Sequence, residues 1–434
     1  MNKKIHQHLL AGNSLKKSSS LNQLGFTLVE LMVAIVLGLL LTAAVLQTYL
    51  STKQTYRVTE GVSRVQENAR FALHFLTKDL RNAGYSGCIG RVRNKLNGDP
   101  TEYISFESAV IGWDYDDTTA TNTATNDFSL SATNAALDLP TDVNKWGRTN
   151  SAGGTSPLPA ILQGEVARGS DVLWFKNFEE LDIIIKEHND KSVSIVAESE
   201  HGVPNDSIML VGNCSEVELF QHLSQGQGKQ VNLNANTGAG GSPGNRAIGG
   251  SLAEWSRLYT AEDNLYGFVQ TYYYIGEGAS GLPSLFRFRT GKPSITVTST
   301  DVTGTAEELV EGVESMQVVF GEDLNNDDNP NRYISASEVT NWDDIVSVRV
   351  GLLYRTPNNS TDQDQSTSYT LLDNINFTHD ANDNLLRYVT NTTVKLRNRG
   401  LDENLAYYIC DAPTDKQSGT NGTDKDGNGV VDCT

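Results

Sequence analysis

The sequence predicts an α+β protein in which one long N-terminal helix precedes a β-rich region. Residues 26–84 contain no proline, and their apolar residues change from a continuous run to a spacing of three or four. Residues 85–434 alternate short β-type runs with turn-rich stretches. We therefore expect the helix to pack against a mainly antiparallel sheet.

The charge balance is acidic, with 34 Lys and Arg against 53 Asp and Glu and a net charge of −19. Such a surface repels polyanions, so we expect no direct binding to nucleic acid. Gly, Ser, Thr and Asn are abundant and only 20% of residues are charged. This composition favours an extracytoplasmic β-rich protein with long loops over a cytosolic enzyme.

The first 49 residues have the pattern of a membrane-insertion signal. Residues 1–25 contain four lysines and no acid, and residues 26–49 are almost entirely apolar. About 20 apolar residues suffice to span a bilayer as a helix, and the basic flank stays in the cytoplasm. A cleaved secretory signal would have a shorter apolar core followed by a small-x-small site. We therefore predict a transmembrane segment over 26–49 in the inner membrane, with an amphipathic continuation over 50–84 and the rest on the periplasmic side.

Glu30 is the exception within the apolar run. An unpaired acid in hydrocarbon costs about 2.5–3.5 kcal/mol on insertion scales. Two explanations are open: Glu30 reaches the lipid headgroups, or it finds its partner only in an assembly.

The segment "GFTLVEL" (25–31) resembles the processing site of type IV prepilins and of type II secretion pseudopilins. The resemblance implies that prepilin peptidase cuts between Gly25 and Phe26, that Phe26 is N-methylated, and that Glu30 serves assembly. The 25-residue leader is longer than is typical. In a filament of staggered helices, Glu30 of one subunit could meet the Phe26 amine of another, which would neutralise the buried acid. Losing the leader's four lysines leaves 30 bases against 53 acids, a net charge of −23.

Beyond the apolar run, Val58, Val62, Val65, Ala69, Leu73, Leu76 and Leu80 follow helical spacing. The helix should end near Asn82–Gly84, with glycine as its C-cap. A single helix of about 55 residues would be roughly 80 Å long.

Strands are predicted at residues 170–176, 181–186, 206–212, 268–276, 284–289, 316–322, 344–356 and 386–397. Residues 304–315 are predicted to form a short helix. Residues 116–159 and 224–251 are low in complexity and are interpreted as surface insertions or mobile loops. Tyr272–Tyr274 should alternate between core and surface.

Five further segments are similar to landmarks of the PilW family of minor pilins. They are "AGYSGC" (83–88), "VGNCSEVELFQ" (211–221), "LVEGVESMQVVFGED" (309–323), "VSVRVGLLYRT" (346–356) and "RYVTNTTVKLRNR" (387–399). The resemblance implies a pilin-like fold and a minor pilin that primes pilus assembly at or near the tip. It also implies a contribution to twitching motility, adhesion or DNA uptake.

Four cysteines, Cys88, Cys214, Cys410 and Cys433, have no C-x-x-C spacing, which favours two structural disulfides over a metal site. Three pairings are available. We favour Cys410–Cys433, which closes a short loop, and this leaves Cys88–Cys214; the PilW resemblance supports the latter pair.

Two loops have calcium-type spacing, although no cofactor is required. The first offers Asp424, Asp426, Asn428, Val430 and Asp432, with Gly429 at the sharp turn but no residue at position 12. An acidic tail stapled by a disulfide explains it equally well. The second, weaker candidate offers Asp323, Asn325 and Asp327, with Asp328 where glycine is usual; a solvated hairpin loop is the simpler explanation.

Signs of catalysis are poor, since the seven histidines are scattered and no hydrolase or metalloprotease motif occurs. We therefore expect a binding protein whose partners are prepilin peptidase, other minor pilins, the major pilin and, as a further candidate, a tip adhesin. The alternatives are a type II secretion minor pseudopilin and a membrane-anchored periplasmic adhesin or enzyme.

Overall fold

The computed structural model describes residues 26–87, 92–96, 108–115, 127–129, 137–149, 155–191, 194–223, 228–233, 244–245, 254–290, 304–357, 368–378 and 384–398. It divides into two compact units, residues 1–56 and residues 57–434. The N-terminal helix α1 (Leu28–Asn82) has 55 residues, as predicted, and contributes to both units. Gly84 follows its end with a φ of +70°, the left-handed conformation that a C-cap glycine provides.

In the first unit, α1 has an 18-residue window of mean hydropathy 2.6, none of it buried within the chain. By length and composition the helix could cross a membrane. In the second unit, α1 buries a stripe of small and aliphatic residues: Gly61, Val65, Ala69, Ala72, Leu76 and Leu80.

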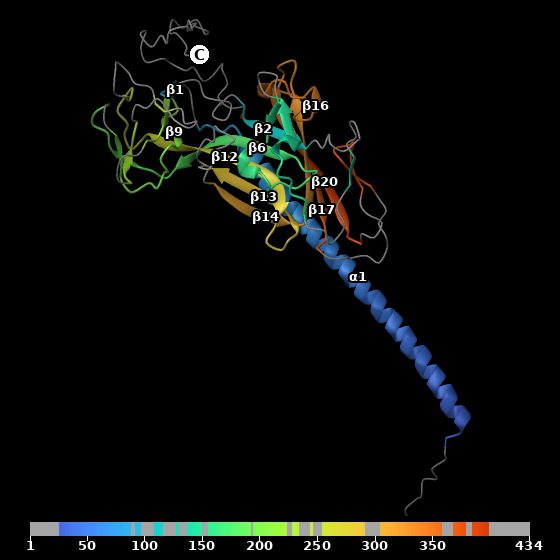
Figure 1. Ribbon diagram of the computed structural model, residues 1–434. Coiled ribbons are helices and arrows are strands. Elements are labelled where there is room, and N and C mark those ends of the chain that lie inside the picture. The colour runs from blue at the N-terminus through green and yellow to red at the C-terminus, as the bar shows by residue number, and fades with distance from the viewer. Residues whose placement is uncertain are drawn as a thin grey trace, which may run out of the picture. The chain divides into compact units, whose positions relative to one another are not determined.

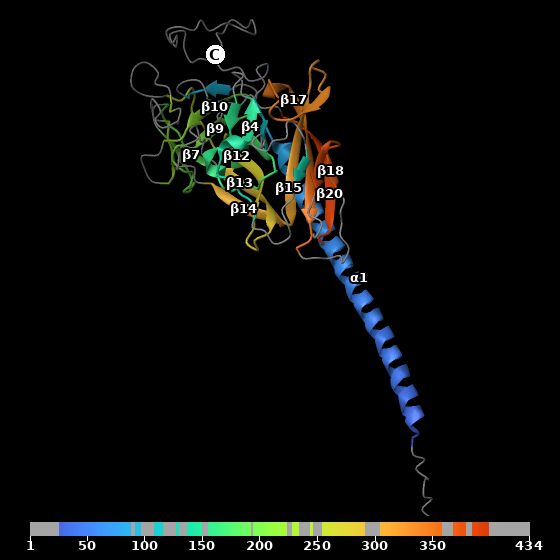
Figure 2. The same cartoon turned by 45° about the vertical axis from the view of Figure 1, so that its right-hand side comes forward.

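The second unit is built from β-sheets, most of whose strand pairs are antiparallel (Figures 1 and 2). The order along the largest sheet is β1 (Val92–Asn94), β10 (Val217–Gln221), β9 (Ile208–Gly212), β12 (Asn264–Glu277), β6 (Val172–Leu181), β2 (Val110–Tyr115), β4 (Trp146–Thr149) and β5 (Thr155–Pro157). It is extended by β13 (Pro283–Thr290), which pairs with β12, and by β14 (Thr305–Glu311), which pairs with β13. All eight predicted strand regions contain strands.

Three smaller sheets accompany it. One has the order β16 (Arg332–Ile334), β15 (Val313–Glu322), β17 (Ile345–Arg355), β20 (Arg387–Lys395). A second has the order β11 (Gln230–Val231), β8 (Ile195–Ala197), β7 (Ile185–Glu187), and a third β18 (Tyr369–Leu371), β19 (Ile375–Thr378), β3 (Asp127–Ser129). Single 3-10 turns are η1 (Val143–Lys145), η2 (Ala160–Leu162) and η3 (Trp342–Asp344).

The main core is filled by stacked aromatic side chains. Trp174 and Tyr272 stack at 5.5 Å with their rings nearly parallel, and Trp113 lies 5.8 Å from Trp174. The buried stripe of α1 belongs to the same cluster. The prediction that Tyr272–Tyr274 alternate between core and surface is wrong, because both faces of β12 are covered and all three rings are buried.

Residues 304–315 form β14 and the start of β15, so the prediction of a short helix here is wrong. The segment has helix-compatible spacing, but β14 pairs with β13 along its length, and Arg287 of β13 binds Glu307 at 2.7 Å. Tertiary pairing thus overrides a weak local preference. Between the two strands, Gly312 has a φ of +79°, and a Cβ there would lie 2.8 Å from the Arg355 carbonyl oxygen.

The interpretation of residues 116–159 as a surface insertion is wrong for its last part. Strands β4 and β5 extend the large sheet, and both Trp146 and Leu158 are buried in the main core. The Trp146 indole N–H donates to the Ser170 carbonyl at 2.8 Å. A few apolar side chains in a Thr- and Asn-rich stretch thus anchor its last part to the core.

A pair of buried aspartates ties the large sheet to the four-stranded sheet. Asp171, just before β6, accepts hydrogen bonds from the Tyr115 N–H at 3.0 Å and the Val318 N–H at 2.9 Å. Asp114 of β2 accepts from the N–H groups of Ala336 and Ser337 at 2.9 and 2.7 Å. Burial raises the pKa of both carboxyls, and the charge of Asp114 raises that of Asp171 further.

The raised pKa values predict a pH-dependent contribution to stability. A carboxyl whose pKa is raised on folding adds stability that is complete below the unfolded value, about 3.9, and is lost as the pH rises through the folded value. The loss is about 1.4 kcal/mol for each pH unit that separates the unfolded pKa from the folded one. Denaturant unfolding of the full chain in detergent, from pH 4 to pH 8, should therefore show the wild type losing stability relative to Asp171→Asn as the pH rises. A difference that stays constant or grows with pH would contradict this assignment.

Candidate functional site: the N-terminal segment and the spine helix

The start of α1 is closed by a capping box between Thr27 and Glu30. The Thr27 carbonyl accepts the first helical hydrogen bond, from the Leu31 N–H at 3.1 Å, so Thr27 is the N-cap. The Glu30 N–H donates to the Thr27 hydroxyl oxygen at 3.2 Å. In return, the Thr27 N–H and hydroxyl donate to the Glu30 carboxylate at 3.5 and 3.4 Å. The role of Thr27 was not predicted, although the T-x-x-E pattern is a known signature of this motif.

The capping box places the Glu30 carboxylate in the first turn of α1, where the positive end of the helix dipole favours an acid. The side chain remains exposed, as does Phe26, which is 83% exposed. Phe26, the predicted new N-terminus, and Glu30, the predicted assembly residue, are therefore both exposed and four residues apart at the start of α1. Gly25 lies outside the described residues.

Two threonine side chains of the apolar region are satisfied within the helix itself. The hydroxyls of Thr42 and Thr48 donate to carbonyls four residues earlier, at 2.8 and 3.0 Å. Such bonds let threonine remain in an apolar environment without an outside partner. Glu30 is the one acidic or basic residue among residues 26–49, so it is the side chain of this region that most needs a partner from outside the chain.

Replacing Thr27 with valine should weaken the start of α1 by about 1 kcal/mol, because the N-cap acceptor is lost while the side-chain shape is kept. Hydrogen exchange of the Leu28–Leu31 amides, with the chain in detergent, should be faster in Thr27→Val. Thr42→Val serves as a control within the same helix. Equal exchange in Thr27→Val and the wild type would contradict the capping box.

The C-terminal half of α1 is fixed to the sheets by polar contacts as well as by its buried stripe. Asp79 accepts hydrogen bonds from the Tyr273 hydroxyl at 2.6 Å and from Arg287 at 3.0 Å. Asn68 donates to the Glu311 carbonyl at 2.8 Å. Because these partners lie on β12, β13 and β14, this half of the helix has a fixed rotation about its axis.

The strand that follows α1 bears on the predicted disulfides. Strand β1 pairs in parallel with β10, with Val92 opposite Val217, and Arg93 forms an ion pair with Glu216. Cys88 precedes β1 by four residues and Cys214 precedes β10 by three. Cys214 is disulfide-bonded. This register supports the pair Cys88–Cys214, which stays a prediction because the three other cysteines lie outside the described residues.

Two comparisons bear on the N-terminal segment and on the second unit. Residues 20–46 match the prokaryotic N-terminal methylation motif. Residues 272–398, from within β12 to just past β20, match the family of type IV pilus-assembly protein W, PilW. The chain is a type IV pilus-related pilin with a PilW domain. No curated protein and no solved structure matches it.

The acidic loop, residues 323–331 after β15, is held by hydrogen bonds between its own backbone and the Asp323 side chain. Asp323 is buried and accepts hydrogen bonds from the N–H groups of Asn325, Asp327 and Asp328, at 3.1, 3.3 and 2.8 Å. Asp328 takes the left-handed turn conformation, with a φ of +61°, that the sequence required of it. Within the described residues there is no group of three or more His, Cys, Asp or Glu side chains that could hold a metal. The other predicted calcium loop, residues 424–432, lies outside them.

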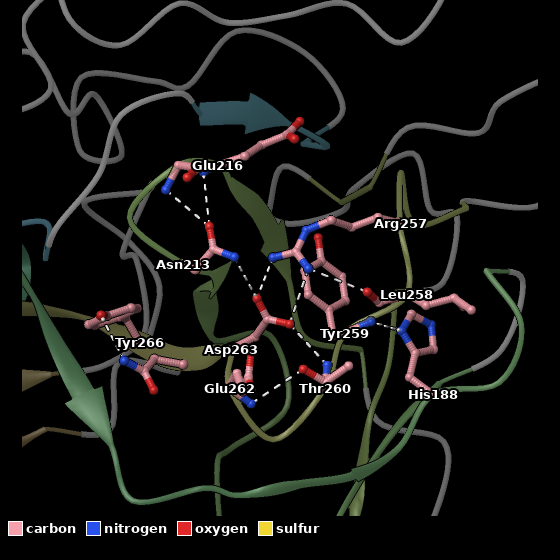
Figure 3. Close-up of polar contacts among 12 residues, drawn as sticks. His188, Asn213, Glu216, Arg257, Leu258, Tyr259, Thr260, Glu262, Asp263 and Tyr266 are labelled. Carbon is pink, nitrogen blue, oxygen red and sulfur yellow. Dashed lines mark hydrogen bonds and ion pairs between the residues drawn. The ribbon is translucent and has the colours of Figure 1, made fainter.

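A second polar network lies beside Cys214 (Figure 3). Asp263 is buried and binds Arg257, the Thr260 N–H at 2.9 Å and the Asn213 amide at 3.3 Å. Arg257 lies over the Tyr259 ring, and His188 accepts from the Tyr259 N–H at 3.0 Å. Burial and the nearby Glu218 raise the pKa of the Tyr259 hydroxyl, so the hydroxyl is a poor proton donor. These contacts bind the network's members to one another, which favours a structural role over a catalytic one.

Proposed function

We propose that this protein is a minor type IV pilin that primes pilus assembly and lies at or near the pilus tip. Prepilin peptidase cuts between Gly25 and Phe26 and methylates Phe26. The apolar half of α1 holds the precursor in the inner membrane, with residues 57–434 on the periplasmic side, and later packs among the helices of other pilins. Cys88–Cys214 and Cys410–Cys433 are the proposed disulfides; calcium binding stays a prediction for both acidic loops.

The observation that carries this proposal is the charged first turn of a helix whose N-terminal part is otherwise apolar. Glu30 is held in place by Thr27, in a helix whose apolar surface finds no cover within the first unit. A charge held at a defined position in such a helix is costly alone and favourable beside a positive partner. The amine of a methylated Phe26 on a neighbouring subunit is such a partner.

The experiment compares a strain lacking this protein with strains complemented by the wild type or by an empty vector. We expect surface pili and twitching to fall sharply without the protein and to return with the wild type. Immunogold labelling should place the protein at pilus ends. Export of type II secretion substrates should be unchanged. Normal pili together with lost export would instead identify a type II secretion pseudopilin.

A further inference from the structure

A hollow of about 450 Å³ lies where the end of α1, the end of β20 and the acidic loop meet. It is lined by Arg81, Asp328, Val346, Thr393, Val394, Lys395, Leu396 and Arg397. These residues come from four separate parts of the sequence, and all belong to the second unit. We call this hollow the basic groove.

The walls of the basic groove are fixed by the backbone. Strand β20 is held against β17, with Lys395 opposite Ser347, and the Leu396 N–H donates to the Val346 carbonyl at 2.9 Å. On the other side, the Asp328 N–H donates to the Asp323 carboxylate at 2.8 Å. A groove made of paired strands and a hydrogen-bonded loop is pre-formed, so a ligand need not order it on binding.

Along β20 and the two residues after it, side chains alternate between a buried face and an exposed face. Val394 and Leu396 point inward and are buried with Val346, whereas Thr393, Lys395 and Arg397 are exposed on the opposite face. The buried face anchors this part of the chain to the core, and the exposed face gives the basic groove a polar, cationic surface.

The exposed surface of the groove carries an excess of positive charge. Arg81, Lys395 and Arg397 contribute three cations against the single carboxylate of Asp328. Within the described part of the chain, none of the three basic side chains forms a hydrogen bond or an ion pair. The negative end of the α1 dipole accounts for a basic residue at position 81, but no helix end accounts for Lys395 and Arg397. In a chain of net charge −19, like charges gathered without partners indicate a binding surface.

We propose that the basic groove binds an acidic surface segment of a neighbouring subunit in the assembly, an inference that rests on the proposed function. Charge complementarity selects this partner, because a surface with three cations, unpaired within the described part of the chain, favours carboxylates. Arg81, Lys395 and Arg397 bind the partner's carboxylates.

The test places a photoreactive benzoyl-phenylalanine at Thr393, inside the groove, in cells that make pili. A matched chain carries it at Lys186, an exposed residue of β7. After irradiation, the cross-linked peptides are identified by mass spectrometry. We expect the residue at position 393 to cross-link to an acidic segment of another subunit. The combined variant Arg81→Glu, Lys395→Glu and Arg397→Glu should lower the yield about tenfold, as expected from three exposed ion pairs of about 0.2–1 kcal/mol each. Lys186→Glu should leave the yield unchanged.

Cross-linking to this chain's own residues, to a neutral or basic segment, to a polysaccharide or to nothing would overturn the inference. The same samples report whether Phe26 is the N-terminus and whether the protein is in sheared pili. Those readouts test the proposed function separately. The cross-link is scored in whichever fraction holds the protein, so the inference is decided in either case.

Discussion

Glu30→Gln is expected to leave the protein cleaved and stable in the membrane but to remove most of it from sheared pili. Glutamine keeps the size of the side chain and one acceptor for the Thr27 N–H, but it removes the charge. The positive amine of the neighbouring subunit would then be buried without a partner. Removing one member of a buried ion pair costs about 3–5 kcal/mol, which corresponds to roughly a hundredfold or more in each subunit contact.

The matched control is Glu60→Gln on the same helix. Glu60 is also exposed, but it forms an ion pair within its own helix, with Arg64 at 3.3 Å. An i,i+4 pair of this kind contributes about 0.3–0.5 kcal/mol, so pilus incorporation should be nearly unchanged. Quantitative blotting of sheared pili and membranes measures both variants. Equal incorporation of Glu30→Gln and the wild type would show that Glu30 serves no assembly contact.

Arg387→Met is expected to cause the largest loss of stability within the PilW segment. Arg387 and Glu314 are both buried and form a two-pronged ion pair across the four-stranded sheet, with N–O distances of 2.6 and 3.0 Å. Arg355 lies 3.6 Å from the same carboxylate. Methionine keeps the length and the apolar part of the side chain but leaves Glu314 buried with one weaker partner, at a cost of about 3–5 kcal/mol.

The double variant Arg387→Met with Glu314→Leu should recover part of that loss, since it removes the uncompensated carboxylate. Arg349→Met on the neighbouring strand is the control, because its partner Asp373 is 86% exposed and the pair should contribute at most about 1 kcal/mol. Chemical unfolding of the full chain in detergent measures all three. If Arg387→Met and Arg349→Met lower the free energy of unfolding equally, the buried pair Arg387–Glu314 contributes no more than an exposed pair, which contradicts the prediction.

The spine helix and its end could be predicted from the sequence because their determinants are local. Apolar spacing, the absence of proline and a glycine near residue 84 fix α1 without reference to any other part of the chain. The cap at Thr27 is equally local, and the letters T-x-x-E were sufficient to find it, although it was not predicted.

The errors come from segments whose structure depends on distant partners. Residues 305–311 form a strand because they pair with the free edge of β13. The seven residues themselves carry no pattern that predicts this pairing. Trp146 is buried because Ser170 and the aromatic core lie beside it, although its sequence neighbours read as a surface loop. Neither the free edge of β13 nor the burial of the Trp146 indole could be predicted without knowing the fold.

The same reason explains why the basic groove could not be predicted. Arg81, Lys395 and Arg397 are unremarkable in sequence, and Arg81 is more than 300 residues from the other two. Only the pairing of β17 with β20, and the position of the acidic loop, bring them to one hollow. The two buried aspartates, Asp114 and Asp171, were invisible in sequence for the same reason.

The central claim is that residues 1–25 are removed and that the chain then acts as a pilin. Its most direct test is the intact mass and N-terminal sequence of the protein from cells with and without prepilin peptidase. We predict a chain that begins at N-methyl-Phe26 when the peptidase is present and at Met1 when it is absent. A chain that still begins at Met1 in cells containing the peptidase would show that residues 26–49 are only a membrane anchor. That result would contradict the proposal that the chain is a processed pilin.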